Sequence, residues 1–208
     1  MNRQILLENQ LKHWHEVISD RPRDPDAYIR RGMVYFKLGQ IAESIKDFDQ
    51  AEALDPRIKP YLWQRGLSYY YGEQFQAGAE QFEIDLTVNS QDVEETVWRY
   101  LCLAKLEGVE SARISLLPVS DDSRTIMEQV YSLYQGNCTP DEVINRGTWL
   151  GQQGRFYAHL YVGLYYEAAG DQERSRYFIT QAATQYKLND YMWDLSVVHC
   201  QLRRWQSN

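Results

Sequence analysis

Long apolar runs are missing from this sequence of 208 residues. The first ten residues, MNRQILLENQ, hold an apolar run of only three residues, whereas the core of a signal peptide needs ~7 to 15. No later stretch approaches the ~18 uncharged apolar residues of a membrane-spanning helix. The sequence as written therefore predicts a cytoplasmic protein with no direct membrane insertion. An envelope or exported location stays open if a leader was removed.

Cysteine is scarce, because the chain has only Cys102, Cys138 and Cys200. Their odd number and wide, irregular spacing exclude a disulfide framework and a Cys-x-x-Cys pair. We therefore expect three small buried hydrophobic side chains in a reducing compartment.

Positive charge is in the minority, with 22 Lys and Arg against 29 Asp and Glu and a net charge of −7. A general attraction to nucleic-acid phosphates or to anionic lipid is thereby disfavoured. The charge predicts neutral or basic partners and no nucleic acid.

Motifs of catalysis are also absent. The sequence has no Gly-x-Ser-x-Gly, His-Glu-x-x-His, P-loop or Rossmann glycine pattern. His13 and His15 lie two residues apart on an expected helix, so their side chains point about 200° away from each other and cannot share a metal ion. Neither His159 nor His199 has a second ligand at the i,i+4 spacing. The sequence predicts no catalytic residue, no metal and no cofactor.

The acidic groups have a structural explanation. Asp92, Glu94 and Glu95 open one expected helix, and Asp121 with Asp122 precedes another. Negative charge at a helix N-terminus complements the helix dipole. An enzyme with a site inside a helical array remains only as a remote alternative.

What the sequence does contain is a repeat of 34 residues. Residues 25–58 align without a gap on 59–92, and the identical pairs are Arg31/Arg65, Gly32/Gly66, Tyr35/Tyr69, Gln40/Gln74 and Phe48/Phe82. A weaker third copy follows in phase, with Arg99, Leu103, Ala112 and Leu116 at corresponding positions. Such a period is typical of arrays of helical hairpins.

A further copy begins at Phe156. There Gly163, Gly170, Ser175 and Ala182 reproduce the spacing of Gly32, Gly39, Ser44 and Ala51. Residues 121–155 form a degenerate copy that still has a strong helix start at Thr139, Pro140 and Glu142. Within the first copy, Asp24 and Pro25 predict a capped helix start, and Gly39 predicts its end.

These features predict one solenoid domain over residues 1–208. It has an N-terminal helix (1–20), five repeats (25–58, 59–91, 92–120, 121–155 and 156–188) and a C-terminal capping helix (190–206). Leu7, Leu11, Trp14 and Ile18 give the first helix an apolar face, and Leu195, Val198, Leu202 and Trp205 do so for the last. Both helices are expected to close the ends of the array. Alternatively, the first helix pairs with a second copy of the chain in a homodimer.

The repeat resembles the tetratricopeptide repeat (TPR) family over about residues 25–186. The residues at the marker positions of that family are Gly32, Tyr35, Gly39, Phe48, Ala51 and Pro56. The resemblance implies an all-α fold, a right-handed superhelix of antiparallel helix pairs, and a role in protein binding. It also implies that the first helix of each pair lines a concave groove. Those positions are Ile29, Met33, Phe36 and Lys37 in the first repeat, Trp63, Leu67, Tyr70 and Tyr71 in the second, and Val97, Leu101 and Lys105 in the third.

This lining is apolar and rich in rings, as interfaces with peptides and proteins often are. In one subgroup of the family, Lys, Asn and Arg side chains in the groove grip the free carboxylate of chaperone tails. This sequence has Ile29, Met33, Gln64, Glu94 and Trp98 there, which argues against that binding mode. Trp63 and Tyr70 could instead pack against neighbouring repeats or the terminal helices.

Three arginines, Arg31, Arg65 and Arg99, recur in register. They could form a ladder of carboxylate or phosphate clamps. We expect instead that they pair within the chain with acids such as Asp47 or Glu83, because an isolated buried arginine would be costly.

A narrower resemblance is to a TPR lipoprotein adaptor of the bacterial envelope (new lipoprotein I type). It rests on the segments 65–72, 97–101, 105–106 and 134–137, and it implies a dimeric adaptor. The function predicted from the sequence is a non-catalytic scaffold that binds a peptide or helix of a partner in its groove. The alternative is a self-associating module without a peptide ligand.

Overall fold

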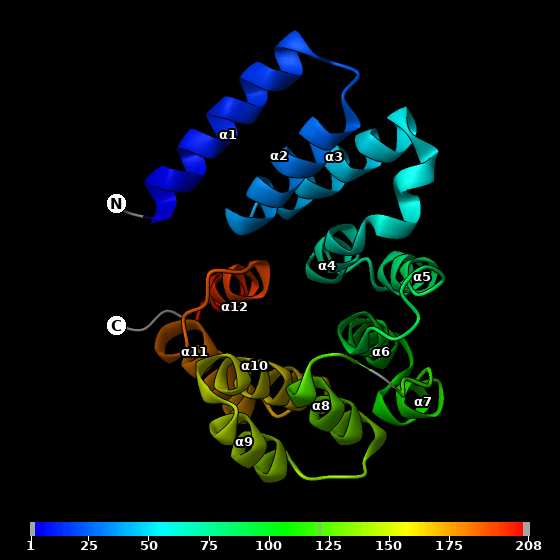
Figure 1. The fold of residues 1–208 in the computed structure, drawn as a ribbon, viewed down its shortest axis with the longest axis vertical. Helices are drawn as coiled ribbons and strands as arrows, with labels where there is room; N and C mark the ends of the chain where they lie inside the picture. Colours follow the sequence, from blue (N-terminus) through cyan, green and yellow to red (C-terminus); the bar gives the residue numbers. More distant parts are fainter. Residues whose placement is uncertain (1–2, 121, 206–208) are drawn as a thin grey trace. The chain divides into compact units, whose positions relative to one another are not determined.

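The computed structural model describes residues 3–120 and 122–205, and these residues form helices and connecting segments without a strand. The all-α class predicted from the sequence is thereby confirmed. The α-helices are α1 (Arg3–Asp20), α2 (Pro25–Lys37), α3 (Ile41–Leu54), α4 (Trp63–Tyr71), α5 (Phe75–Asp85), α6 (Val93–Glu107), α7 (Val109–Ile114), α8 (Thr125–Gln135), α9 (Pro140–Trp149), α10 (Gly151–Ala168), α11 (Gln172–Gln185) and α12 (Tyr191–Leu202) (Figure 1). A 3-10 helix, η1 (Pro56–Tyr61), joins α3 to α4.

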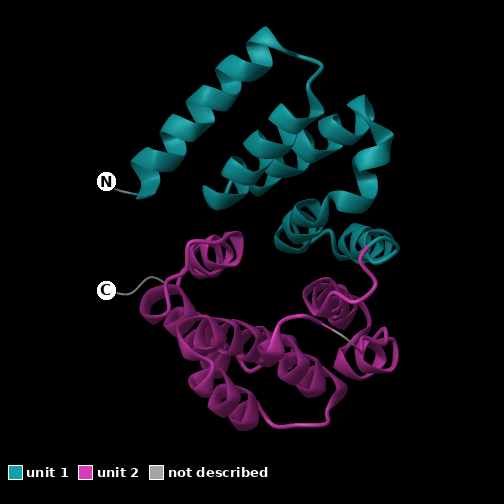
Figure 2. Ribbon diagram, in the orientation of Figure 1, with its two compact units in different colours: residues 1–88 teal, residues 89–208 magenta. Residues whose placement is uncertain are grey.

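The helices fall into two compact units, residues 1–88 with α1 to α5 and residues 89–208 with α6 to α12 (Figure 2). We call them unit 1 and unit 2. In unit 1, α2 packs on α3 and α4 on α5. In unit 2, α6 packs on α7, α8 on α9 and α10 on α11. Consecutive helices thus pair as the repeat pattern predicts.

The helix boundaries follow the capping residues. The Asp24 side chain accepts a hydrogen bond from the Asp26 backbone N–H at 3.1 Å, and Pro25 begins α2. Gly39 follows α2 with φ of 74°, a left-handed conformation that glycine adopts without strain. At the start of α9, Thr139 and Glu142 form the reciprocal capping box. The caps expected from these residues are confirmed.

Small residues bring the two helices of each pair together. In unit 1, the Ser44 hydroxyl donates to the Gly32 carbonyl oxygen at 2.8 Å across the α2–α3 contact. A Cβ atom added at Gly66 would lie only 2.6 Å from the Phe82 ring. A Cβ added at Gly163 in unit 2 would lie 2.4 Å from the Ile179 side chain. Packing therefore requires glycine at positions 66 and 163.

The centre of unit 2 is α10. Residues 156–164 of this helix are all buried, and α10 packs on α8, α9 and α11. Inside the unit, the Tyr134 hydroxyl donates to the Tyr161 carbonyl oxygen at 3.0 Å.

The first helix of the chain packs on α2. Leu7 and Ile18 of α1 are buried, and the Tyr35 hydroxyl lies 3.2 Å from His15 Nε2. Ile5 and Leu6 at the start of α1 stay 50% and 40% exposed.

The last helix, α12, packs on α11 and ends at Leu202, before the predicted boundary. Trp205 follows the helix end, and its ring lies 5.0 Å from that of His199.

The cysteine prediction is only partly right. Cys102 is buried, whereas Cys138 and Cys200 are half-buried, and all three are free thiols.

Candidate functional site

The predicted groove residues of unit 1 lie on α2 and α4, and they divide by exposure. Phe36, Leu67, Tyr70 and Tyr71 are buried, with exposed fractions from 0 to 8%. Ile29, Met33, Lys37 and Trp63 are half-buried. Only this second set offers surface to a partner.

The buried rings hold α2 and α4 together. The Phe36 and Tyr71 rings meet edge to face with centroids 5.7 Å apart, and Tyr70 contacts Tyr71 in the same way at 5.4 Å. Edge-to-face ring pairs add stabilisation beyond their buried area. These rings therefore link α2 to α4, and Tyr70 is buried among them.

The predicted groove residues of unit 2 lie on α6. Val97 and Leu101 are fully buried, whereas Lys105 is exposed. The sequence could not separate these cases, because it gives the helix face of a residue but not the neighbours that cover it.

The arginine ladder is paired within the chain, as expected. Arg31 donates to both carboxylate oxygens of Asp47 at 2.8 Å. Arg65 donates to Gln81 at 2.9 and 2.7 Å, and it also pairs with the carboxylates of Asp49 and Glu52. Gln81, sixteen residues after Arg65, thus takes the place that Asp47 has beside Arg31. Glu83 as a partner of these arginines stays a prediction. The guanidinium of Arg99 donates to the Ser115 carbonyl oxygen at 2.9 Å.

Three of the histidines have partners within their own unit. His15 Nδ1 lies 2.8 Å from the Leu11 carbonyl oxygen, and His159 Nδ1 lies 2.8 Å from that of Arg155. Buried His199 lies 3.9 Å from the Glu167 carboxylate, and burial lowers the pKa of His199 to about 4. Within residues 3–120 and 122–205, no three His, Cys, Asp or Glu side chains are grouped as metal ligands.

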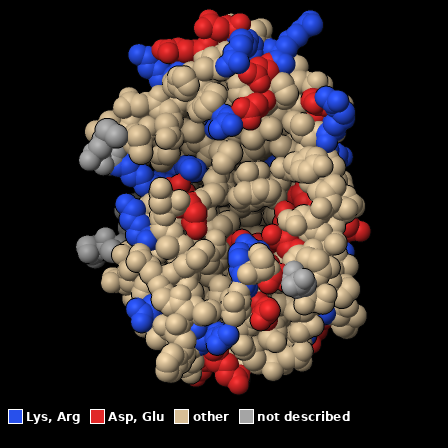
Figure 3. Space-filling model, in the orientation of Figure 1, with Lys and Arg blue, Asp and Glu red and all other residues tan. Residues whose placement is uncertain are grey.

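A polar cluster in unit 2 was not predicted from the sequence. We call Arg124, Asp92, Glu94 and Asp122 the Arg124 cluster. The Arg124 guanidinium donates to Asp122 at 2.9 and 2.7 Å, to Asp92 at 3.2 Å and to Glu94. Figure 3 shows acidic side chains gathered around a basic one on the unit 2 part of this face. Three carboxylates thus surround one guanidinium.

Tyrosines of α10 extend this cluster. The Tyr161 hydroxyl donates to Glu94 at 2.5 Å, and the Tyr157 hydroxyl donates to Asp190 at 3.4 Å. Burial raises the pKa of Glu94 to about 7, against the opposing effect of Arg124.

The sequence places Asp92 at a helix start, and its carboxylate does accept the Glu95 backbone N–H at 3.0 Å. Asp121, which was expected to act similarly, lies outside the described residues. Because Arg124 is 30 residues from Glu94 and 32 from Asp92, no local pattern could reveal their contact.

The helix pair formed by α2 and α3 is similar to a known protein family. Residues 25–58 match the family model of the tetratricopeptide repeat. Three similar proteins are organizing proteins of Hsp70 and Hsp90. The Triticum aestivum protein is 25% identical over 117 residues, which cover 55% of this chain and 20% of that protein.

The other two are from Arabidopsis thaliana. Organizing protein 3 is 25% identical over 136 residues, and organizing protein 2 is 28% identical over 138 residues. Each match covers 65% of this chain and 20% of the relative, so the chain spans about a fifth of the length of these relatives. Together with the helix pairs, these matches support the TPR family for the chain. None of its described helices is both long and apolar enough to span a bilayer.

Proposed function

We propose that this chain is a non-catalytic scaffold that binds an extended peptide or a helix of a partner protein on the exposed part of α2 and α4. The observation that carries the proposal is the half-buried set of Ile29, Met33 and Trp63, with Lys37 on the same helix as the first two. Methionine and tryptophan give adaptable and extensive apolar contact at interfaces. The buried ring contact between α2 and α4 stiffens the two helices that carry this set, so little conformational entropy would be lost on binding.

The named partners of the relatives do not transfer directly. A clamp for a terminal carboxylate needs cationic or amide donors directed at one point. Of the five corresponding positions, Ile29 and Met33 are apolar, Trp98 is 1% exposed, and Glu94 lies in the Arg124 cluster, so only half-buried Gln64 carries a suitable donor. These side chains support an apolar peptide segment as the ligand in place of a chaperone tail.

A double substitution tests the proposal. In Met33→Ala/Trp63→Ala, we expect the loss of partners that the full chain captures and crosslinks in extracts of its native organism. The matched control is Tyr61→Ala/Val88→Ala, which removes two apolar side chains of unit 1 that are 64% and 49% exposed. Circular dichroism verifies that both variants keep their helix content. If both variants capture the same partners as the unmodified chain, α2 and α4 are not the binding surface.

Self-association through α1 is the second candidate function. It is favoured by the exposure of Ile5 and Leu6 on a helix whose other face packs on α2. The narrower resemblance to a dimeric envelope adaptor points the same way and remains a prediction. Light scattering of the full chain and of Ile5→Glu/Leu6→Glu separates the candidates. A mass that falls from dimer to monomer supports self-association through α1, and a mass that is monomeric in both argues against it.

A further inference from the structure

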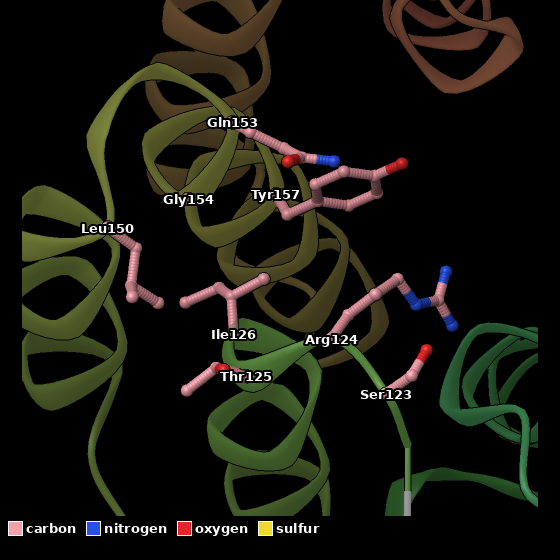
Figure 4. A pocket seen from close by; sticks show the side chains of 8 residues that line it. All are labelled: Ser123, Arg124, Thr125, Ile126, Leu150, Gln153, Gly154 and Tyr157. Carbon is pink, nitrogen blue, oxygen red and sulfur yellow. The ribbon is translucent and has the colours of Figure 1, made fainter.

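A cavity of about 280 Å³ lies in unit 2 where α8 and α10 begin, and none of its lining residues belongs to the surface proposed above (Figure 4). Its lining consists of Ser123, Arg124, Thr125, Ile126, Leu150, Gln153, Gly154 and Tyr157. The volume is just below the ~300 to 1,000 Å³ of small-molecule pockets, so it suits one or two side chains of a peptide better than a cofactor.

The cavity has an apolar side and a polar side. In Figure 4 the Ile126 side chain points toward Leu150, while the Arg124 guanidinium and the Tyr157 hydroxyl extend in the opposite direction. Gly154 lets Leu150 pack closely on α10, because a Cβ atom at Gly154 would lie only 2.5 Å from Leu150 Cβ. Trp149, next to Leu150 in the chain, is 86% exposed, and exposed tryptophan is enriched at protein interfaces.

On its polar side the cavity adjoins a second one of about 300 Å³. The two share Ser123 and Arg124, and the second is also lined by Asn89, Gln91, Asp92 and Asp122. The charge at this junction is negative even when Glu94 is protonated, because the single guanidinium of Arg124 faces the carboxylates of both Asp92 and Asp122. A positively charged group in the second cavity would reduce this excess.

We infer that these two cavities bind a partner segment in which an apolar side chain is followed by lysine or arginine. The apolar side chain enters between Ile126, Leu150 and the Tyr157 ring. The following cation lies beside Asp92 and Asp122, where opposite charges attract and like charges are rejected.

Short blocked peptides test this site on the full chain. We would titrate the isotopically labelled protein with acetyl-Leu-Lys-amide and follow backbone amide shifts by NMR. Shift changes are expected at Ser123, Ile126, Gly154 and Tyr157. Acetyl-Leu-Glu-amide, with the charge reversed, and acetyl-Ala-Lys-amide, with the apolar side chain removed, should each bind more weakly. Equal binding of the glutamate peptide, or shift changes confined to α2 and α4, would overturn the inference.

A pair of matched variants tests the role of charge. Asp92→Asn removes one carboxylate beside Arg124 but keeps an N-cap for α6, since asparagine caps as well as aspartate. Asp171→Asn makes the same change at the N-cap of α11, and Asp171 lines neither cavity. We expect Asp92→Asn to weaken binding of the lysine peptide about threefold to tenfold and Asp171→Asn to leave it unchanged. Equal affinity of both variants for the lysine peptide would contradict the inference.

A third variant tests the apolar side. Leu150 is 37% exposed, so Leu150→Ser should fold, and we expect it to bind the lysine peptide several-fold more weakly. Unchanged affinity would show that the apolar cavity does not take part in binding the peptide. The site does not depend on Met33 or Trp63, so the failure of either proposal leaves the other testable.

Discussion

Arg31 of α2 donates two hydrogen bonds of 2.8 Å to the carboxylate of Asp47, sixteen residues later on α3. The same interval joins Arg65 to Gln81 and Arg99 to the Ser115 carbonyl oxygen. Sixteen residues is the interval that brings the first helix of a pair beside the second. One contact therefore recurs in three successive pairs with three different acceptors.

The Arg31–Asp47 pair should contribute measurably to stability. The two side chains are 16% and 7% exposed, so removing Arg31 leaves a largely buried carboxylate without its partner. We expect Arg31→Met to lower the free energy of unfolding by about 2 to 4 kcal/mol. A double-mutant cycle with Asp47→Asn, measured by urea unfolding, should give a coupling energy of ~1 to 3 kcal/mol.

The control is the exposed pair of Arg30 and Asp26 on the same helix, whose side chains are 54% and 61% exposed. Its coupling energy should be no more than ~1 kcal/mol, because water screens it. Equal coupling energies for the two pairs would contradict the role given to burial.

Gly66 should tolerate alanine less well than Gly32, its counterpart one repeat earlier. A Cβ at Gly66 would lie 2.6 Å from the Phe82 ring, whereas at Gly32 the nearest atoms are 3.3 Å away. We expect Gly66→Ala to destabilise the protein by ~1 to 3 kcal/mol through overpacking. In Gly32→Ala the better helix propensity of alanine, up to ~1 kcal/mol, should offset most of the strain. Thermal or urea unfolding that ranks the two variants equally would refute this difference.

Asp85 should make stability depend on pH. It is 1% exposed, and burial raises its pKa to about 7. At a pH between its ordinary pKa and 7, the folded protein holds a proton that the unfolded chain has lost. The contribution of Asp85 to the free energy of unfolding therefore falls as pH rises through this window, by about 1.4 kcal/mol for each unit of pKa difference, and is constant above it.

Asp85→Asn should remove this dependence, since its amide oxygen can still accept the Gln81 bond of 2.6 Å. Urea unfolding at pH 5 and pH 8 would measure the effect. We expect the free energy of unfolding of Asp85→Asn to exceed that of the unmodified chain by the largest amount at pH 8. Glu80→Gln, an exposed change on the same helix, is the control and should show no such gain.

Thr139 should stabilise the start of α9 through its cap. Its hydroxyl accepts the Glu142 backbone N–H at 3.3 Å. Thr139→Ala should cost about 1 kcal/mol, and Thr139→Ser should cost little, because serine keeps the accepting oxygen. Amide hydrogen exchange in the first turn of α9 would locate the effect. Equal amide exchange rates in Thr139→Ala and Thr139→Ser would show that the hydroxyl does not stabilise the start of α9.

Much of the fold could be predicted from local patterns. The spacing of Gly32, Gly39 and Ala51 gave a helical hairpin, and Asp24 and Thr139 gave helix starts, because caps and turns act over a few residues. The cysteine prediction was less successful, since Cys138 and Cys200 share their residue type with Cys102 but not its surroundings. The division of the chain into two compact units had no visible signal in the repeat.

The sequence by itself determined the period, the helix pairs, the caps and the partner of Arg31, because each depends on residues within about one repeat of each other. Only the tertiary structure decided which groove positions stay accessible, since Phe36 and Met33 lie on the same helix but differ in what packs over them. It also decided that Arg124 meets Glu94 and Asp92, because that contact depends on how whole helix pairs pack, and no short-range pattern records it.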